Sequence, residues 1–299
     1  MRGSSEFLNP GASNMFFLIG VVVVIGSVLG GYLPHGSFAV LIQPLEVVII
    51  CGSALGAFII SNPKTVIFGV LGSIGKILKG TPYNKAAYEE LLTLQYTIFK
   101  LAKAKGMLAL EAHIEDPEKS SIFSAFPNIM KNHHAIEFIC DYLRLMTMGT
   151  ENSHEMEALM DEDIETDHHE QHAVSAAVTT AGDGLPAFGI VAAVLGVIIT
   201  MQYISEPPEV LGGKIAAALV GTFLGIFLAY GFVGPMGKSL EAYAEAETKY
   251  YQCMKAGMLA YLNGYAPAVA VEFARKTLYS HERPSFKEIE EAVENAPKV

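Results

Sequence analysis

The stretch AGDGLPAFGIVAAVLGVIITMQYIS, residues 181–205, decides how this chain folds. It holds no charged side chain from Gly184 to Ser205, and about 20 apolar residues are enough for a helix to cross a membrane. A second such stretch, IAAALVGTFLGIFLAYGFVGPMG, occupies residues 215–237. Each carries a proline near one end, Pro186 or Pro235, and neither carries an acid or a base within its apolar run. Together they predict a pair of membrane-spanning helices.

The composition of the whole chain agrees with a protein that crosses the membrane several times. Of its 299 residues 51% are hydrophobic and only 17% charged, whereas soluble domains are usually about a quarter charged. The formal net charge is −11, which excludes nucleic-acid binding because that function needs a basic surface. The three cysteines are far apart and lack metal-ligand spacing, so we expect buried free thiols.

Four apolar runs are long enough to span a membrane, and they divide the chain into five segments. The polar, glycine- and serine-rich start MRGSSEFLNPGASN is typical of a vector-derived tag, and the apolar run that follows it is interpreted as a retained span. The predicted segments are an expression tag at 1–14, two spans within 15–61, a cytoplasmic domain at 62–183, two spans within 184–236, and a C-terminal cytoplasmic helical segment at 237–299.

Basic residues predict which side of the membrane each segment faces. The linkers 34–44 and 205–213 contain no lysine or arginine, whereas Lys64, Lys76, Lys79 and Lys238 lie close to span ends on the other side. Because cytoplasmic loops carry the excess of basic residues, both termini and the long 62–183 segment are expected in the cytoplasm. The apolar run with spaced lysines at 64–80 is predicted to lie at the inner membrane interface.

The polar segments show helical periodicity. Residues 84–106 repeat apolar side chains at three- and four-residue spacing and end at Gly106, a plausible C-cap. Residues 237–264 continue the fourth span as one long helix. No alternation typical of a strand occurs over any length. The predicted fold is therefore all-α, a polytopic membrane protein with four transmembrane helices and a helical cytoplasmic domain.

The third and fourth spans contain no carboxylate that would carry a proton, although ion paths in membranes are usually marked by ionisable residues. Either the chain transports no ions or a partner brings the carboxylate. The two prolines have an ordinary interpretation as well: Pro186 would occupy a first helical turn, and Pro235 would kink or end its helix. Thr222 would simply bond to its own helix backbone.

Two polar clusters outside the spans are candidate binding sites. Lys103 and Lys105 precede Gly106, and Glu111 follows it, which is compatible with a charged docking patch or with lysines that complement a helix C-terminus. His168 and His172 have the i, i+4 spacing of a metal site, but a solvated helix face in this acidic run is favoured. No metal and no cofactor are expected.

Five long motifs resemble the MotA family of flagellar motor stator subunits, within the MotA/TolQ/ExbB superfamily. They are GSVLGGYL at 26–33, EMEALMDEDIET at 155–166, GDGLPAFGIVAAVLGV at 182–197, LVGTFLGIFLAYGFVGP at 219–235 and LNGYAPAVAVEFARKTLYSHERPSF at 262–286. The resemblance covers nearly the whole chain after residue 14. It implies a homopentamer in the bacterial inner membrane around a MotB-like dimer, whose single-span subunits each supply a membrane aspartate. Protonation of that aspartate would drive rotation against the rotor protein FliG.

The resemblance also implies roles for single residues. Pro186 and Pro235 match the two prolines that flank the aspartate of the partner, and Thr222 matches a threonine facing the ion path. Glu111 matches an acidic rotor-facing residue. Lys103 stands where the family commonly has arginine, which keeps the charge but loses bidentate pairing; Lys105 is a second candidate for that role.

Ion choice depends on Ala193, where sodium-type relatives carry a threonine. A dehydrated sodium ion needs several oxygen ligands, and the sequence around Ala193 supplies no hydroxyl. The resemblance therefore implies that the translocated ion is a proton, with sodium disfavoured.

Three rival functions have to be weighed against a stator. An ExbB/TolQ-like energiser of an outer-membrane process would generally lack the long segment between the second and third spans and the rotor-facing charges. A passive channel would conduct without a partner. An intramembrane enzyme would need paired catalytic groups, and the spans contain no such pair. The chain is therefore predicted not to be an enzyme.

Overall fold

A computed structural model describes residues 10–150 and 152–296, and no strand occurs among them. This confirms the all-α prediction. Residues 1–9 of the predicted tag lie outside the described residues, and helix α1 (Pro10–Tyr32) includes the remaining tag residues 10–14. Four helical stretches are long and apolar enough to cross a membrane, as predicted.

The chain packs as two compact units. Met1–Gly80 with His169–Ala244 forms the first, here called the span unit, and Thr81–His168 with Glu245–Val299 forms the second, here called the helical unit. These boundaries describe packing within the protein. The predicted boundaries at residues 61, 183 and 236 separate membrane segments from cytoplasmic segments. They depend on where the bilayer lies, and they stay a prediction.

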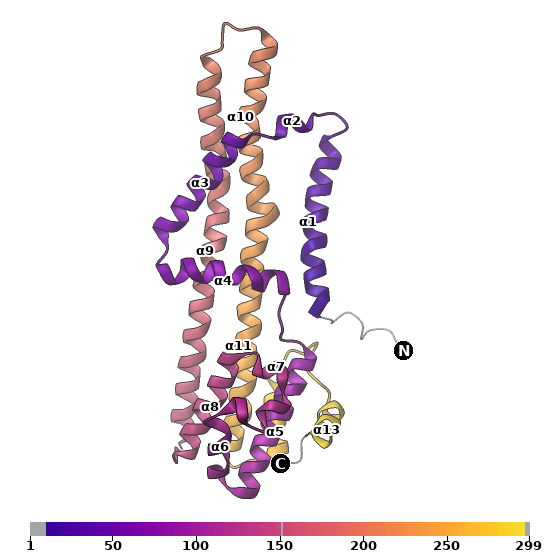
Figure 1. The fold of residues 1–299 in the computed structure, drawn as a ribbon, viewed down its shortest axis with the longest axis vertical. Helices are drawn as coiled ribbons and strands as arrows, with labels where there is room; N and C mark the ends of the chain where they lie inside the picture. The colour runs from indigo at the N-terminus through magenta and orange to yellow at the C-terminus, as the bar shows by residue number, and fades with distance from the viewer. Residues whose placement is uncertain (1–9, 151, 297–299) are drawn as a thin grey trace. The chain divides into compact units, whose positions relative to one another are not determined.

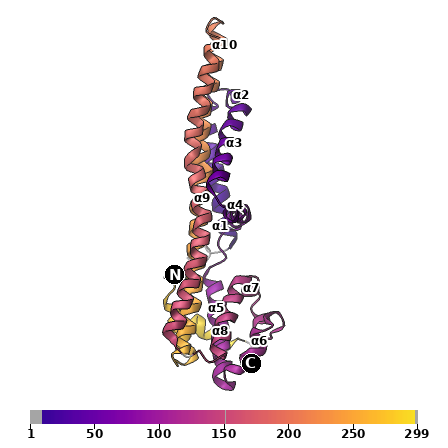
Figure 2. The same cartoon turned by 90° about the vertical axis from the view of Figure 1, so that its left-hand side faces the viewer.

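The span unit holds all four candidate spans (Figure 1). Its elements are α1, α2 (Phe38–Leu41), α3 (Pro44–Ser61), α4 (Lys64–Lys79), the last part of α9 (Ser153–Met201), α10 (Pro208–Leu228), the π-helix η4 (Ala229–Val233) and the start of α11 (Gly234–Leu262). Helices α2 and α3 contact α10, and α1 contacts α4 and η4. Helix α4 runs across the direction of α9 and α10, which suits the predicted interfacial helix (Figures 1 and 2).

Three span boundaries differ from those predicted, each at a proline or a polar turn. The second span is split, because α2 ends at Leu41 and α3 begins at Pro44. The helix of the third span ends at Met201, four residues before the end of the quoted apolar stretch at Ser205. The fourth begins at Pro208 and continues without a break through η4 into α11. Proline favours the first helical turn, where its missing N–H leaves no bond unmade.

The ordinary explanation of Pro186 as a first-turn residue is wrong. Helix α9 begins at Ser153 and passes through Pro186 as an interior residue. Pro235 likewise lies inside continuous helix, directly after the π-turn. An interior proline removes a backbone hydrogen bond and its ring collides with the carbonyl four residues earlier. Both prolines therefore mark strained points in their helices.

The helical unit is built around α5 (Lys85–Lys105), as predicted from its periodicity. Its remaining elements are η1 (Met107–Leu110), α6 (Glu111–Ile114), η2 (Pro117–Lys119), η3 (Phe123–Ala125), α7 (Pro127–Met130), α8 (His133–Thr147), the start of α9, the rest of α11, α12 (Pro267–Lys276) and α13 (Phe286–Glu294). Helix α5 contacts α12, α13, α7 and η1.

Local signals fix both ends of α5. The Asn84 side chain accepts a hydrogen bond from the backbone N–H of Ala87 at 3.0 Å, which caps the N-terminus. Gly106 ends the helix with φ +84°, a conformation that favours glycine. Between them the helix buries Tyr88, Leu91 and Phe99 almost completely, so α5 is the hydrophobic centre of this unit.

Candidate functional site

Glycines line the contact between α9 and α10, here called the α9–α10 seam: Gly189, Gly196, Gly221 and Gly225. A β-carbon built on Gly225 would lie 2.6 Å from the carbonyl oxygen of Leu185, and one on Gly196 would lie 2.7 Å from the β-carbon of Ala218. The two helices run side by side in both views (Figure 2). Small residues permit this approach, which is how membrane helices associate without a hydrophobic driving force.

Two of the predicted ion-path residues meet at the seam. A β-carbon on Gly221 would lie 3.2 Å from the backbone nitrogen of Ala193, and one on Gly189 would lie 3.4 Å from the α-carbon of Thr222. Ala193 and Thr222 are both half-buried. The structure thus places these two residues on facing turns of α9 and α10, although they are far apart in sequence.

The hydroxyl of Thr222 makes no hydrogen bond within the described part of the chain, so the expected bond to its own helix does not form. Thr200, on the facing helix, behaves in the ordinary way and donates to the carbonyl oxygen of Gly196 at 2.8 Å. A hydroxyl that is half-buried and not bonded internally is available to an ion, a water molecule or a partner group.

The two prolines lie at the same level of the hairpin. A β-carbon on Gly182 would lie 3.3 Å from the backbone nitrogen of Gly234, so the turn before Pro186 packs against the turn that contains Pro235. Each proline has a glycine four residues earlier, Gly182 or Gly231, whose backbone carbonyl is the one that the proline ring meets in a regular helix. The π-turn absorbs the remaining misfit: Gly234 N–H donates to the carbonyl of Ala229, five residues back.

Among the described residues, two buried clusters at this level of the span unit contain no Asp, Glu, Lys, Arg or His. One cluster consists of Ile50, Ala54, Leu185, Ala192 and Ala229, and the next of Ile77, Val178 and Leu240. The seam can therefore position a hydroxyl and two strained backbones, but it cannot itself accept and release a proton.

The predicted docking residues lie together at one end of α5, in the helical unit. Lys103 and Lys105 occupy its last turn, and Glu111 begins α6 just beyond η1. All three are exposed, and none of their side chains forms a hydrogen bond or ion pair within the described residues. The structure keeps them available for another molecule.

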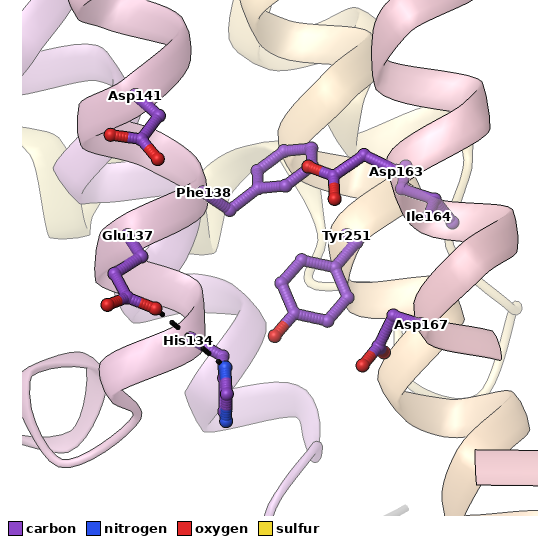
Figure 3. Close-up of a pocket in the computed structure, with 8 residues that line it drawn as sticks. All are labelled: His134, Glu137, Phe138, Asp141, Asp163, Ile164, Asp167 and Tyr251. Carbon is purple, nitrogen blue, oxygen red and sulfur yellow. Dashed lines mark ion pairs between the residues drawn. The ribbon is translucent and has the colours of Figure 1, made fainter. Parts of the chain in front are cut away.

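A pocket that sequence reasoning missed lies elsewhere in the helical unit, between α8, α9 and α11 (Figure 3). It measures about 180 Å³ and is lined by four carboxylates (Glu137, Asp141, Asp163, Asp167), with His134, Phe138, Ile164 and Tyr251. The signal was present as two acidic i, i+4 pairs, one on each of two helices. None of the predicted site residues lies in it.

The carboxylates of this pocket have partners of their own. Tyr142 donates to Asp163 at 3.0 Å, Arg144 bonds to Asp141 at 2.7 Å, and His134 lies 3.9 Å from Glu137. Burial, together with the hydrogen bond to Asp163, raises the pKa of the Tyr142 phenol. Of the predicted histidine pair, Nδ1 of His168 lies 3.0 Å from Oγ1 of Thr248. Among the described residues no three potential ligands gather around a metal position.

Comparison with known proteins identifies the family. Residues 18–106 match the Motility protein A N-terminal family and residues 130–253 match the MotA/TolQ/ExbB proton channel family. Motility protein A of Escherichia coli K12 is 47% identical over 280 residues, covering 93% of this chain and 95% of that protein. Chemotaxis protein LafT of Vibrio parahaemolyticus is 36% identical, covering 91% and 96%.

Solved structures show the same fold. The flagellar MotAB stator complex from Bacillus subtilis superposes with a TM-score of 0.73 at 28% identity, covering 90% of this chain and 98% of that one. A C. jejuni MotAB structure gives a TM-score of 0.75 at 21% identity. This chain belongs to the MotA family of flagellar motor stator subunits.

Proposed function

We propose that this subunit works with a MotB-like single-span partner as a proton-conducting unit that converts ion flow into torque on the rotor. The observation that carries the proposal is the α9–α10 seam. It presents the free hydroxyl of Thr222 between two proline-strained helices and contains no carboxylate. A proton path needs a titratable group, and here a second chain has to supply it.

The partner is inferred from chemistry and from relatives. A single membrane aspartate facing Thr222 would complete the path, and the similar solved structures are complexes named MotAB. By the same reasoning we propose a homopentamer around a MotB-like dimer. It would lie in the bacterial inner membrane among lipids, with both termini of this chain in the cytoplasm and with FliG as the rotor partner.

The energy available per proton limits the mechanism. One elementary charge moved through 100 mV yields about 2.3 kcal/mol. That amount is comparable to the cost of about 3 kcal/mol of a proline inside a helix. Protonation of the aspartate would therefore supply energy of the same order as a change in helix packing at Pro186 and Pro235. Each cycle would turn this subunit relative to its partner, and Lys103, Lys105 and Glu111 would push on rotor charges.

The decisive experiment reconstitutes the chain in vesicles with and without a partner that bears a membrane aspartate. We expect proton uptake and rescue of motility in a stator-null strain only with the intact partner, and loss of both when that aspartate becomes asparagine. Conduction by the chain alone would instead indicate a passive channel. The energiser alternative is not favoured, because the 47% identity to Motility protein A extends over nearly the whole chain.

A further inference from the structure

An exposed leucine lies in the middle of the charged turn at the end of α5. Leu108 is 72% exposed, whereas Leu110 in the same short helix η1 is 1% exposed and packs inward. A single exposed leucine is ordinary on a protein surface. Leu108 differs because of the charged residues on either side of it.

The charged side chains on either side of Leu108 form no ion pair or hydrogen bond within the described residues. Two other lysines of the helical unit have partners: Lys85 bonds to Glu288 at 2.7 Å and Lys255 to Asp161 at 2.6 Å. Lys103, Lys105 and Glu111 have none. A run of unpaired charges around an exposed apolar side chain has the make-up of an interface, with an apolar centre and a polar rim.

The backbone holds this turn in one compact arrangement. Gly106 N–H donates to the carbonyl of Ala102 at 2.9 Å, and Ala109 N–H donates to the carbonyl of Gly106 at 3.1 Å. The positive φ of Gly106 turns the chain directly from α5 into η1. Leu108 therefore follows the two lysines and precedes Glu111 on a fixed turn, so little ordering is needed when a partner binds.

We propose that Leu108 is the apolar anchor of the rotor-docking surface, between a basic side formed by Lys103 and Lys105 and an acidic side formed by Glu111. The occupant is a segment of the rotor protein. It presents an acidic group toward the lysines, a basic group toward Glu111 and an apolar pocket for Leu108. The charges orient the encounter, and the desolvated leucine holds the complex. This inference rests on the proposed docking role of the three charged residues.

The test uses the full chain, fluorescently tagged and co-expressed with its partner subunit in motile cells. Leu108→Ala and Leu108→Gln should each reduce stator recruitment to motors about tenfold, the effect of losing one anchoring side chain. Leu108→Met keeps the apolar volume and should recruit normally. Phe286→Ala is the matched control: Phe286 is 61% exposed in α13, which pairs with the opposite end of α5 through Lys85.

The outcomes separate this inference from the docking function itself. If Lys103→Glu with Lys105→Glu abolishes recruitment while Leu108→Ala recruits normally, the anchor is wrong and the charged surface stands. If neither change reduces recruitment, the docking function fails as well. If Leu108→Met reduces recruitment as much as Leu108→Gln does, the loss does not depend on the apolar side chain and the inference is overturned. The inference is also overturned if Phe286→Ala reduces recruitment equally, because the loss is then not specific to the anchor. Crosslinking from Leu108→Cys to a second copy instead of the rotor protein would also overturn it.

Discussion

The backbones of Gly189 and Gly225 touch. A β-carbon built on Gly225 would lie 2.9 Å from the α-carbon of Gly189, on the facing helix. At this point α9 and α10 approach too closely for a side chain on either glycine, and the contact lies beside Thr222. The position of the Thr222 hydroxyl at the seam therefore depends on the absence of two side chains.

Replacing Gly225 by alanine should separate the helices. Its β-carbon would collide with the carbonyl oxygen of Leu185, a backbone atom that has no other rotamer to adopt. We expect a loss of about 1–3 kcal/mol, as for other overpacked sites. It would be measured as a lower unfolding temperature of the solubilised stator complex. Gly213→Ala, in the same helix but with nothing within 4 Å of its β-carbon, is the control and should not lower it. Equal stability of the two variants would refute the close contact.

Replacing either interior proline should leave assembly intact and impair rotation. Pro186→Ala or Pro235→Ala restores a backbone N–H and removes a helix defect that costs about 3 kcal/mol, so each variant should be at least as stable as the parent. The stiffer helix should slow swimming, measured against the amount of assembled complex. Pro208→Ala is the control. It replaces a proline in the first turn of α10, where no helical hydrogen bond is missing, and cells that carry it should swim normally. Normal swimming by both interior variants would show that the strain has no mechanical role.

Removing the Thr222 hydroxyl should reduce proton flux without loss of the fold. Thr222→Val keeps the side-chain shape but not the oxygen, whereas Thr222→Ser keeps the oxygen and should conduct. Thr200→Val is the matched control, because the Thr200 hydroxyl already donates a hydrogen bond to the carbonyl oxygen of Gly196. That hydroxyl is therefore not available to an ion. Flux would be followed as acidification of vesicles that contain the complete stator. Equal flux through the valine and serine variants would remove Thr222 from the path.

Exchange of sodium for potassium should leave motor speed unchanged at a fixed proton-motive force. The seam beside Ala193 offers the single hydroxyl of Thr222 and would not replace the several oxygen ligands that a dehydrated cation needs. Speed would be read from tethered cells while sodium is withdrawn. A motor that stops without sodium would contradict the proton assignment.

The ion pair between Lys85 and Glu288 should make the stability of the helical unit depend on pH. The hydrogen bond from Lys85, followed by bonds from Ser285, lowers the pKa of Glu288 to about 2. A lowered folded-state pKa stabilises the protein above the unfolded value of 4.5, and this contribution disappears as pH falls from there toward 2. Both side chains are about two-fifths exposed, so the contribution at pH 7 is at most about 1 kcal/mol.

Glu288→Gln should therefore lower stability at pH 7 and match the parent near pH 2. Chemical denaturation of the solubilised protein, followed by circular dichroism, would measure the difference at each pH. Glu290→Gln is the control, because Glu290 is an exposed residue of the same helix with no ion pair among the described residues. A difference between Glu288→Gln and the parent that persists unchanged to pH 2 would contradict the assignment.

The helical class, the four apolar spans and the helix within residues 84–106 could be predicted from the sequence because periodicity and apolar length are local properties. The ends of α5 were predictable for the same reason, since Gly106 needs a positive φ. The course of α9 was not. It runs without a break from the acidic residues after Ser153 through the third span to Met201, which makes Pro186 an interior residue.

The candidate site likewise combines features that the sequence predicts with features that depend on the tertiary fold. Residue types alone indicated that the spans lack a carboxylate. The meeting of Ala193 with the turn of Thr222 depends on the register of two helices, which no local pattern encodes. The pocket beside Tyr251 was missed because its acids come from α8 and α9, and only the tertiary fold places them on opposite walls.

The π-turn at Ala229–Val233 has a consequence for the phase of the helix that contains it. One residue more than an α-helix would use is accommodated there, so side chains after Gly234 are turned by about 100° relative to a continuous helical wheel drawn from Pro208. Deletion of a single residue in this turn would restore a regular α-helix. Side chains after Gly234 would then keep their phase, whereas straightening the turn without a deletion would rotate them by about 100°. The one extra residue of the π-turn thus sets which side chains face inward at the start of α11.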